Sequence, residues 1–287
     1  MTTERKRTLL AVLAHPDDES FGPGGTLAKY AAQGVDVHIA IATDGAAGSV
    51  AEGFEHARDE LAAVRAKELE AAVRILGGTL HQLAYRDSGY VGDPANDHPE
   101  AFVNADVHEA TGRVVRLIRE LQPQVVITHD ETGGYFHPDH IMCWRITTPA
   151  FHAAGDPAQY PEIGPAPYRP GRLYYTVLPN RWIKLVFIPL MRLRRQDPTR
   201  MGRNQDIDLT RIGQPSDQIH ARINIIDTWE TKRLASAEHK SQGGGTGFGG
   251  FLPQWLQKRL FGTEFFMRAE PPARPGLVEK DLFSAAD

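Results

Sequence analysis

The sequence is poor in cysteine, has no long hydrophobic run and carries no excess of basic charge. Cys143 is the single cysteine among 287 residues, which excludes an intrachain disulfide and a cysteine-rich zinc site. No apolar run approaches the roughly 20 residues that a membrane span requires, so we expect no transmembrane segment. Lys and Arg number 32 against 36 Asp and Glu, and this net charge of −4 argues against a nucleic-acid partner.

The remaining composition is typical of a globular chain, with 41% hydrophobic and 24% charged residues. The N-terminus is basic and leads into a short apolar run. That run meets charged residues where a signal peptide needs its cleavage site, so we expect a first strand and a cytoplasmic protein.

Apolar strands alternate with amphipathic helices over the first half of the chain. The run LLAVLA at 9–14 is continuously apolar, which is typical of a strand buried on both faces of a parallel sheet. The pattern predicts strands at 9–14, 35–42, 80–85, 125–128, 173–178 and 221–226, and helices at 26–33, 58–76, 107–121 and 228–240. This alternation predicts an α/β fold with an open, mostly parallel sheet flanked by helices.

We expect a single domain over residues 1–287, with an inserted helical or irregular segment and a C-terminal extension. The core is assigned to about 8–178 and 219–242, the insertion to about 180–218 and the C-terminal wrap to about 243–287. Residues 182–195 are apolar and basic together, and we favour an insertion packed on the core over a membrane-surface helix. Gly245, Gly247 and Gly250 match G-x-G-x-x-G, but without the strand and helix that a dinucleotide site requires.

Two histidine-rich turns follow predicted strands. His15-Pro16-Asp17-Asp18-Glu19 comes after strand 9–14, and His137-Pro138-Asp139-His140 comes shortly after strand 125–128. Ligands of open α/β sheets bind beyond the carboxyl ends of the strands, so both turns are expected at one edge. Together they can offer two imidazoles and a carboxylate to one divalent ion, with a position left open for water.

A divalent ion lowers the pKa of its bound water toward 7. The residues of the two turns that do not bind the ion can then take part in the reaction. Asp17 can take the proton of that water, and His137 can donate to the reacting carbonyl oxygen or stabilise charge on it. Asp139 can hold His137 in its working orientation. The sequence therefore predicts a hydrolytic metal centre.

The two turns resemble the signature motifs of the PIG-L/LmbE-like N-acetylglucosaminyl deacetylase superfamily, which includes the mycothiol-pathway deacetylase and amidase. Further matching pieces follow in family order, among them Thr43-Asp44-Gly45, Arg86-Asp87-Ser88-Gly89, Gly133-Gly134-Tyr135 and Glu238-His239. The resemblance implies a Rossmann-like fold and hydrolysis of an N-acyl group, usually acetyl on a glucosamine-type amine. It also implies zinc as the cofactor, with ferrous iron as an alternative, and a small N-acetylated amino sugar or glycoconjugate as the substrate.

Site residues follow from the resemblance by motif position. It implies His15, Asp18 and His140 as metal ligands, Asp17 as general base, His137 as acid or stabiliser of the tetrahedral intermediate, and Asp139 as its support. Tyr135 resembles a mobile tyrosine near the oxyanion. Arg65, Asp87 and Asp44 are candidates for substrate binding, and His239 resembles a histidine close to the site.

Structural explanations compete with several of these roles. Arg65 can pair with Glu68 on one helix face, and Asp87 and Asp44 can act as turn formers. We expect His129 to be a core or supporting group rather than a fourth ligand. We expect Cys143 to be a buried thiol.

Other functions remain open at this stage. A mycothiol-conjugate amidase is disfavoured, because that type carries a lysine shortly after the first motif and this chain has none until Lys29. A non-catalytic metal- or carbohydrate-binding relative would not need Asp17 and His137. The sequence leaves open the substrate, the native metal, the choice between Asp17 and His137 as general acid, and whether the protein is an oligomer.

Overall fold

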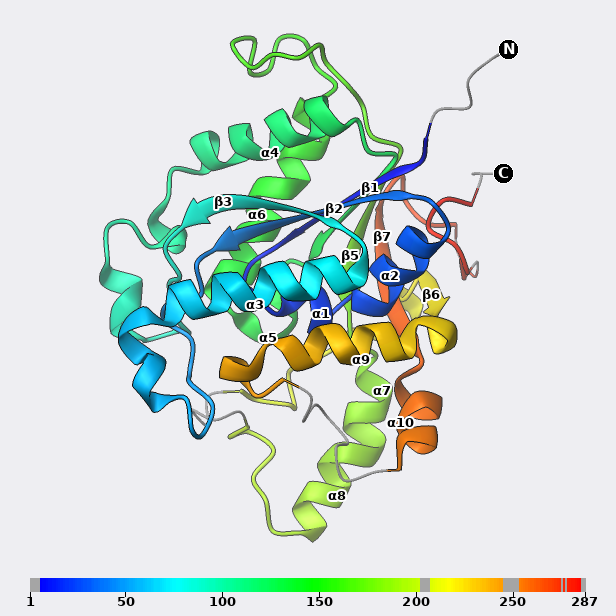
Figure 1. Cartoon of the computed structure of the whole chain (residues 1–287). Helices are drawn as coiled ribbons and strands as arrows, with labels where there is room; N and C mark the ends of the chain where they lie inside the picture. Colours follow the sequence, from blue (N-terminus) through cyan, green and yellow to red (C-terminus); the bar gives the residue numbers. More distant parts are fainter. Residues whose placement is uncertain (1–5, 202–206, 245–252, 275, 277, 285–287) are drawn as a thin grey trace.

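The computed structural model describes residues 6–201, 207–244, 253–274, 276 and 278–284. Seven strands form one sheet in the order β3-β2-β1-β4-β5-β7-β6 (Figure 1). The strands are β1 (Thr8–Leu13), β2 (Asp36–Thr43), β3 (Thr79–Tyr85), β4 (Val125–His129), β5 (Arg172–Val177), β6 (Ala221–Asn224) and β7 (Thr263–Glu270). The five strands from β3 to β5 run parallel, which confirms the predicted open, mostly parallel α/β sheet.

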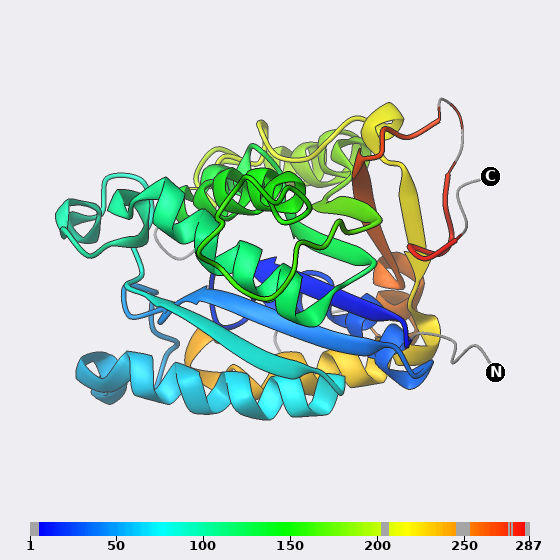
Figure 2. The ribbon, with the colours of Figure 1, turned by 90° about the horizontal axis from the view of Figure 1, so that it is seen from above.

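Helices cover both faces of the sheet, as Figure 2 shows from above. The principal helices are α1 (Asp18–Phe21), α2 (Gly24–Ala32), α3 (Leu61–Leu76), α4 (Val107–Leu121), α5 (Gly133–Phe136), α6 (Pro138–Ala153), α7 (Asn180–Trp182), α8 (Ile188–Leu193), α9 (Trp229–Glu238) and α10 (Gln254–Phe261). Successive side chains of a strand point to opposite faces. In β1, Leu9 and Leu13 therefore join the core under α2, α3 and α9, while Leu10 and Val12 join the core under α4 and α6.

Helix α4 begins and ends where the sequence predicts. The side chain of Asp106 accepts a hydrogen bond from the backbone N–H of Glu109 at 2.8 Å, which caps the first turn. Gln122 adopts a left-handed conformation with φ 51°, and Pro123 follows, so the helix cannot continue.

The expected C-terminal wrap is wrong for residues 263–270, because they form β7 in the sheet. This strand is antiparallel to both β5 and β6 and lies between them. Its inward positions include Glu264 and Arg268, so hydrophobic alternation fails to reveal it. Glu264 accepts bonds from the backbone N–H of Gly25 and Thr26, and Arg268 pairs with Glu279. Buried partners thus let two charged residues occupy a core face.

The insertion forms a small apolar cluster of its own. A π-helical turn, η4 (Ile183–Phe187), connects α7 to α8. Ile188 and Met191 are buried against Leu209 and Ile212 of the same insertion, and Tyr135 packs against this cluster from outside it. Among the described residues, no helix combines the length and hydropathy needed to cross a bilayer. The glycine motif at Gly245 to Gly250 lies outside the described residues, and the single-domain organisation stays a prediction.

Arg119 of α4 is 2% exposed, yet no carboxylate faces it among the described residues. Its guanidinium donates instead to backbone carbonyls of the segment that follows α6. The acceptors are the oxygens of Ala154, Asp156, Gln159, Tyr160 and Ile163, at 2.6 to 3.2 Å. All five N–H groups of an arginine are directional donors, so one side chain fixes this loop on α4.

We expect Arg119→Met to lower the free energy of unfolding by about 3–4 kcal/mol, because it leaves several carbonyl groups without their donor. Arg116→Met removes an exposed arginine from the same helix and is expected to change it by less than about 0.5 kcal/mol. Urea denaturation of both variants measures the difference. Equal stability of the two variants would show that water replaces the guanidinium without cost.

Candidate active site

The pairing of β1 with β4 brings the two histidine-rich turns together at the carboxyl edge of the sheet. His15 and His140 are 125 residues apart in the chain, but His15 Nδ1 lies 3.1 Å from His140 Nε2. Asp18 Oδ2 lies 3.5 Å from the first of these nitrogens and 3.3 Å from the second. Three potential ligand atoms therefore form a nearly equilateral triangle.

In each of the two rings, one nitrogen points away from the triangle and is hydrogen-bonded. This bond determines whether the other nitrogen, inside the triangle, is a donor or an acceptor. His140 Nδ1 donates to the carbonyl oxygen of Gly133 at 3.1 Å, and His15 Nε2 donates to Asp139 Oδ2 at 3.2 Å. In the neutral imidazole the other nitrogen is then an acceptor. Both inner nitrogens and the Asp18 carboxylate thus present lone pairs to one another, an arrangement that a cation between them would stabilise.

The distances also fit a divalent cation. Ligands that bind zinc tetrahedrally at about 2.0–2.2 Å lie about 3.3–3.6 Å from one another, close to the three observed separations. The local charge has the matching sign. Burial alone would lower the pKa of His15, but Asp87, Asp139 and Asp18 outweigh burial and raise that pKa well above its usual range. The surroundings of His15 therefore favour a positive charge, which a proton on Nδ1 supplies until a bound metal ion displaces it.

His129 stacks on His140, with ring centroids 3.9 Å apart. Its Nε2 lies 3.3 Å from the backbone N of Ala14, whose N–H it accepts, and 3.5 Å from Asp18 Oδ2, so Asp18, His129 and His140 also form a group that could hold a metal ion. Burial lowers the pKa of His129 to about 4, so the ring is neutral. That His129 supports the site and does not ligate stays a prediction.

Asp17 adopts a backbone conformation with φ 138°, which is rare for a residue with a side chain. Its backbone N–H donates to Glu19 Oε2 at 3.0 Å, and its carboxylate accepts from Arg65 Nη2 at 3.0 Å. Burial raises the pKa of Asp17 to about 6, with Arg65 opposing that effect and Asp18 adding to it. The structure therefore holds this strained residue at both its backbone and its side chain.

Glu19 is itself held by His239, and both side chains are fully buried. His239 Nε2 lies 2.7 Å from Glu19 Oε1. Arg65 also donates to the carbonyl oxygens of Pro16 and Gly45 and is 2% exposed, so its contacts are internal to the turn. The pairing of Arg65 with Glu68 is not observed. The Glu68 carboxylate instead accepts hydrogen bonds from the backbone N–H and the hydroxyl of Ser241.

His137 is the N-cap residue of α6. Its Nδ1 accepts the backbone N–H of Asp139 at 3.2 Å, which places the proton of the neutral ring on Nε2. The ring lies 4.4 Å from that of His15, between centroids. The expected contact between the Asp139 carboxylate and His137 is not observed, since Asp139 binds His15 and the N–H and hydroxyl of Ser88. Asp139 therefore orients the ring of His15.

Tyr135 lies beside the two imidazoles, with its ring 5.0 Å from that of His140 and 5.8 Å from that of His137. It sits in a turn where Gly134 has φ 73° and Phe136 has φ 68°. The hydroxyl of Tyr90 donates to the carbonyl oxygen of Tyr135 at 2.7 Å. Tyr135 thus belongs to the rim of the site on the side of the insertion.

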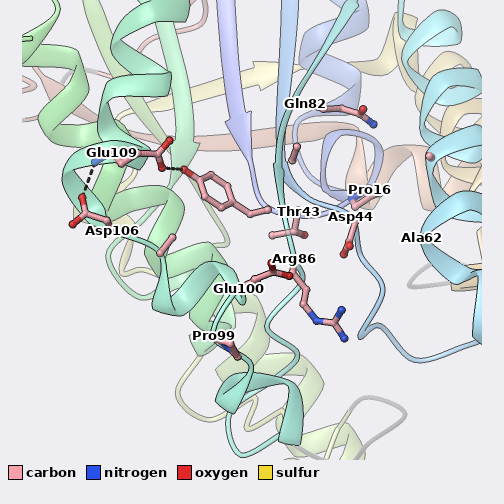
Figure 3. A pocket seen from close by; sticks show the side chains of 14 residues that line it. Pro16, Thr43, Asp44, Ala62, Gln82, Arg86, Pro99, Glu100, Asp106 and Glu109 are labelled. Carbon is pink, nitrogen blue, oxygen red and sulfur yellow. Dashed lines mark hydrogen bonds between the residues drawn. The ribbon is translucent and has the colours of Figure 1, made fainter.

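Asp87 and Asp44 are connected, but they face different spaces. Asp87 is 2% exposed and lies 3.6 Å from His15 Nε2, whereas Asp44 accepts the backbone N–H of Asp87 at 3.0 Å. Asp44 lines a cavity of about 740 Å³ together with Pro16 and Arg86 (Figure 3). The cavity also includes residues of β3 and of the start of α4, and it lies next to the first histidine-rich turn.

Sequence reasoning missed three supporting groups. Glu19 belongs to the first motif, but nothing in the motif shows that it binds the N–H of Asp17. Ser88 follows Asp87 in a turn, and its contact with Asp139 spans 51 residues. The third group is the backbone carbonyl of Gly133, and no side-chain motif indicates its contact with His140. The turn sequences contain these groups, but only the folded structure shows which residue each of them contacts.

The comparisons with known proteins agree with this geometry. Residues 10–151 match the profile of the family PIG-L, described as GlcNAc-PI de-N-acetylase. A relative from Geodermatophilus obscurus, named 1D-myo-inositol 2-acetamido-2-deoxy-alpha-D-glucopyranoside deacetylase, is 36% identical over 97% of both chains. A relative of the same name from Rhodococcus jostii is 45% identical over 83% of this chain and 82% of its own.

Solved structures show the same fold at lower identity. The N,N'-diacetylchitobiose deacetylase from Pyrococcus horikoshii gives a TM-score of 0.60 at 21% identity, over 92% of this chain and 84% of its own. The 4-carboxy-2-hydroxymuconate hydratase from Pseudomonas putida KT2440 gives 0.59 at 19% identity, over 94% and 99%. One fold thus serves different reactions, so the chemistry has to be argued from the site.

The fold and the site define an α/β protein with a candidate divalent-metal centre at the carboxyl edge of its sheet. The two relatives match 97% and 83% of this chain at more than a third identity, and the family profile covers both histidine-rich turns. The chain belongs to the PIG-L family.

We expect His140→Ala to weaken zinc binding by more than about 100-fold, because it removes one of three converging ligand atoms. Competition with a chromophoric chelator measures the affinity. His152→Ala on the same helix removes an imidazole with a half-exposed side chain and is expected to bind zinc like the parent protein. Equal affinity of the two variants would contradict the assignment of His140 as a ligand.

Proposed function

We propose that the protein is a zinc-dependent N-deacetylase that hydrolyses the acetamide group of an amino sugar. The observation that carries this proposal is the convergence of three lone pairs from His15, Asp18 and His140. The ring of His137 lies 4.4 Å from that of His15, Asp17 directly precedes Asp18 in the chain, and metal binding alone requires neither Asp17 nor His137. We assign zinc to the three ligands, with ferrous iron as the alternative ion for this donor set.

A bound zinc ion supplies a Lewis acid that polarises the acetyl carbonyl and acidifies the attacking water. Asp17 takes the proton of that water as general base, and Arg65 holds its carboxylate in position. His137 Nε2 carries a proton and donates it as a hydrogen bond to the oxygen on which negative charge develops.

The proton for the leaving amine is assigned to Asp17. His137 accepts a backbone N–H at Nδ1, so its ring is a neutral donor at Nε2 and loss of that proton would leave an imidazolate. Asp17 has just received a proton from the water and can return it to the amine nitrogen. One carboxyl group therefore serves as base and then as acid.

The substrate class is proposed from the relatives. Both curated relatives are named for a deacetylase of an N-acetylglucosaminyl inositol. We propose the same substrate class for this chain, and also a cytoplasmic location, which agrees with a chain whose one cysteine is a buried thiol.

The direct test is turnover of N-acetylglucosaminyl inositol by the full chain after chelation and after the return of zinc or, without oxygen, of ferrous iron. We expect equal amounts of acetate and free amine, no turnover in chelator, and recovery on adding the ion. A mycothiol S-conjugate serves as the comparison substrate. Turnover of that conjugate alone would favour the amidase, and binding of the ion without any turnover would favour the non-catalytic relative.

We expect Asp17→Asn to lower kcat by about 10²–10⁴-fold, since an amide cannot take up a proton. His137→Asn keeps an N-cap acceptor for α6 but withdraws the Nε2 donor, and we expect a loss of about 10²–10³-fold in kcat. Both variants are expected to retain zinc. Asp36→Asn changes a half-exposed aspartate on β2 and serves as the control for stability and turnover. Parent-like kcat in Asp17→Asn would contradict its role as base.

We expect Glu19→Gln to lower kcat by about 10–100-fold with an unchanged zinc affinity and KM. The substitution disturbs the acceptor that holds the backbone of Asp17, and small misplacements of a catalytic group have effects of this size. Glu264→Gln alters another buried glutamate that binds backbone N–H groups but lies in β7, and it controls for stability alone. Equal kcat in the two variants would show that Asp17 needs no such support.

A further inference from the structure

The insertion has a second apolar side that faces solvent. Leu185 is 65% exposed and Leu193 is 81% exposed, while Ile188 and Met191 of the same segment are buried. The segment is therefore apolar on both sides, and only its inner side is covered by the protein. Scattered single exposed leucines are ordinary, but a group on one short element calls for an explanation.

The segment that carries the exposed leucines is also rich in basic residues. Between residues 180 and 200 the chain carries six basic residues and a single acidic residue, Asp197, although its overall net charge is −4. The basic residues are Arg181, Lys184, Arg192, Arg194, Arg195 and Arg200, and all are exposed. Six of the 32 basic residues of the chain thus lie between residues 180 and 200, in the segment that contains the exposed Leu185 and Leu193.

Helix α10 also combines exposed apolar side chains with basic residues. Trp255 is 70% exposed and Leu260 is 46% exposed, and the helix carries Lys258 and Arg259 without an acidic residue. Figure 1 places α7, α8 and α10 at the same end of the molecule, away from the two termini. Tryptophan and leucine interleaved with basic residues are the composition of helices that lie in a membrane interface.

We infer that this face, formed by η4, α8 and α10, docks on an anionic lipid surface. Exposed Leu185, Leu193 and Trp255 enter the boundary between headgroups and acyl chains, and the basic side chains meet the lipid phosphates. A second protein copy is disfavoured as the occupant, because two identical basic faces would repel each other. The inner side of the insertion packs against Tyr135, so the lipid surface lies one helix layer from the candidate active site.

The inference is tested by sedimentation of the full chain with vesicles, at low and at high salt. One set contains equal parts of phosphatidylglycerol and phosphatidylcholine, and the other contains phosphatidylcholine alone. We expect binding to the anionic vesicles that weakens with salt, and little binding to the neutral ones. Equal binding to both sets, or no binding to either, would overturn the inference.

Two multiple variants separate charge from apolar insertion. Arg192→Gln/Arg194→Gln/Arg195→Gln is expected to lower the partition coefficient by about 100-fold, because each basic residue near an anionic surface contributes about fivefold. Leu185→Asn/Leu193→Asn is expected to lower it by at least about tenfold. Neither variant alters a residue assigned to catalysis, so kcat on a water-soluble substrate should stay that of the parent protein.

Matched controls change the same residue types elsewhere. Arg74→Gln/Arg116→Gln/Arg145→Gln removes equal charge from exposed positions on other helices, and Val91→Asn removes another exposed apolar side chain. Both controls should bind anionic vesicles within about threefold of the parent protein. Sedimentation equilibrium of the parent protein and of the leucine variant tests whether a second copy of the chain binds to this face instead. A dimer that the leucine variant dissociates, without vesicle binding, would show that a second copy covers this face.

Discussion

The candidate site depends on three lone pairs that face one another at the edge of the sheet. Separations of 3.1 to 3.5 Å between His15, Asp18 and His140 bring like partial charges together, which is unfavourable without a cation. The protein maintains this arrangement through the outer ring nitrogens, which donate to Asp139 and to Gly133. The tautomers of both imidazoles are therefore set by two buried groups outside the triangle.

The remaining site residues are organised around that triangle. Glu19, His239 and Arg65 form a buried network whose common target is Asp17, at its backbone and at its carboxylate. His137 is held from the opposite side by the start of α6. A hydratase of a different reaction shares the fold, so the sheet alone does not decide the chemistry. In the proposed mechanism, the reaction depends on which groups these two networks present to the candidate metal centre.

Much of the fold was predictable because it is locally encoded. The apolar strands, the helix over 107–121 and the two histidine-rich turns follow from periodicity, capping and motif spacing. Strand β7 was not predictable in this way, because Glu264 and Arg268 face inward and break the alternation. Their buried partners lie far away in the sequence or in another element, and no local pattern indicates them.

Short stretches of consecutive residues predict the class of the sheet, the two turns and the residue types that can bind a divalent ion, because each of these features is local. The partner of each site residue depends on the packing of distant segments. Asp139 turns to His15 and not to His137, and Arg65 turns to Asp17 and not to its helix neighbour. Such pairings depend on distances of a few ångströms between segments far apart in the chain, and only the packing of the sheet and its helices sets those distances.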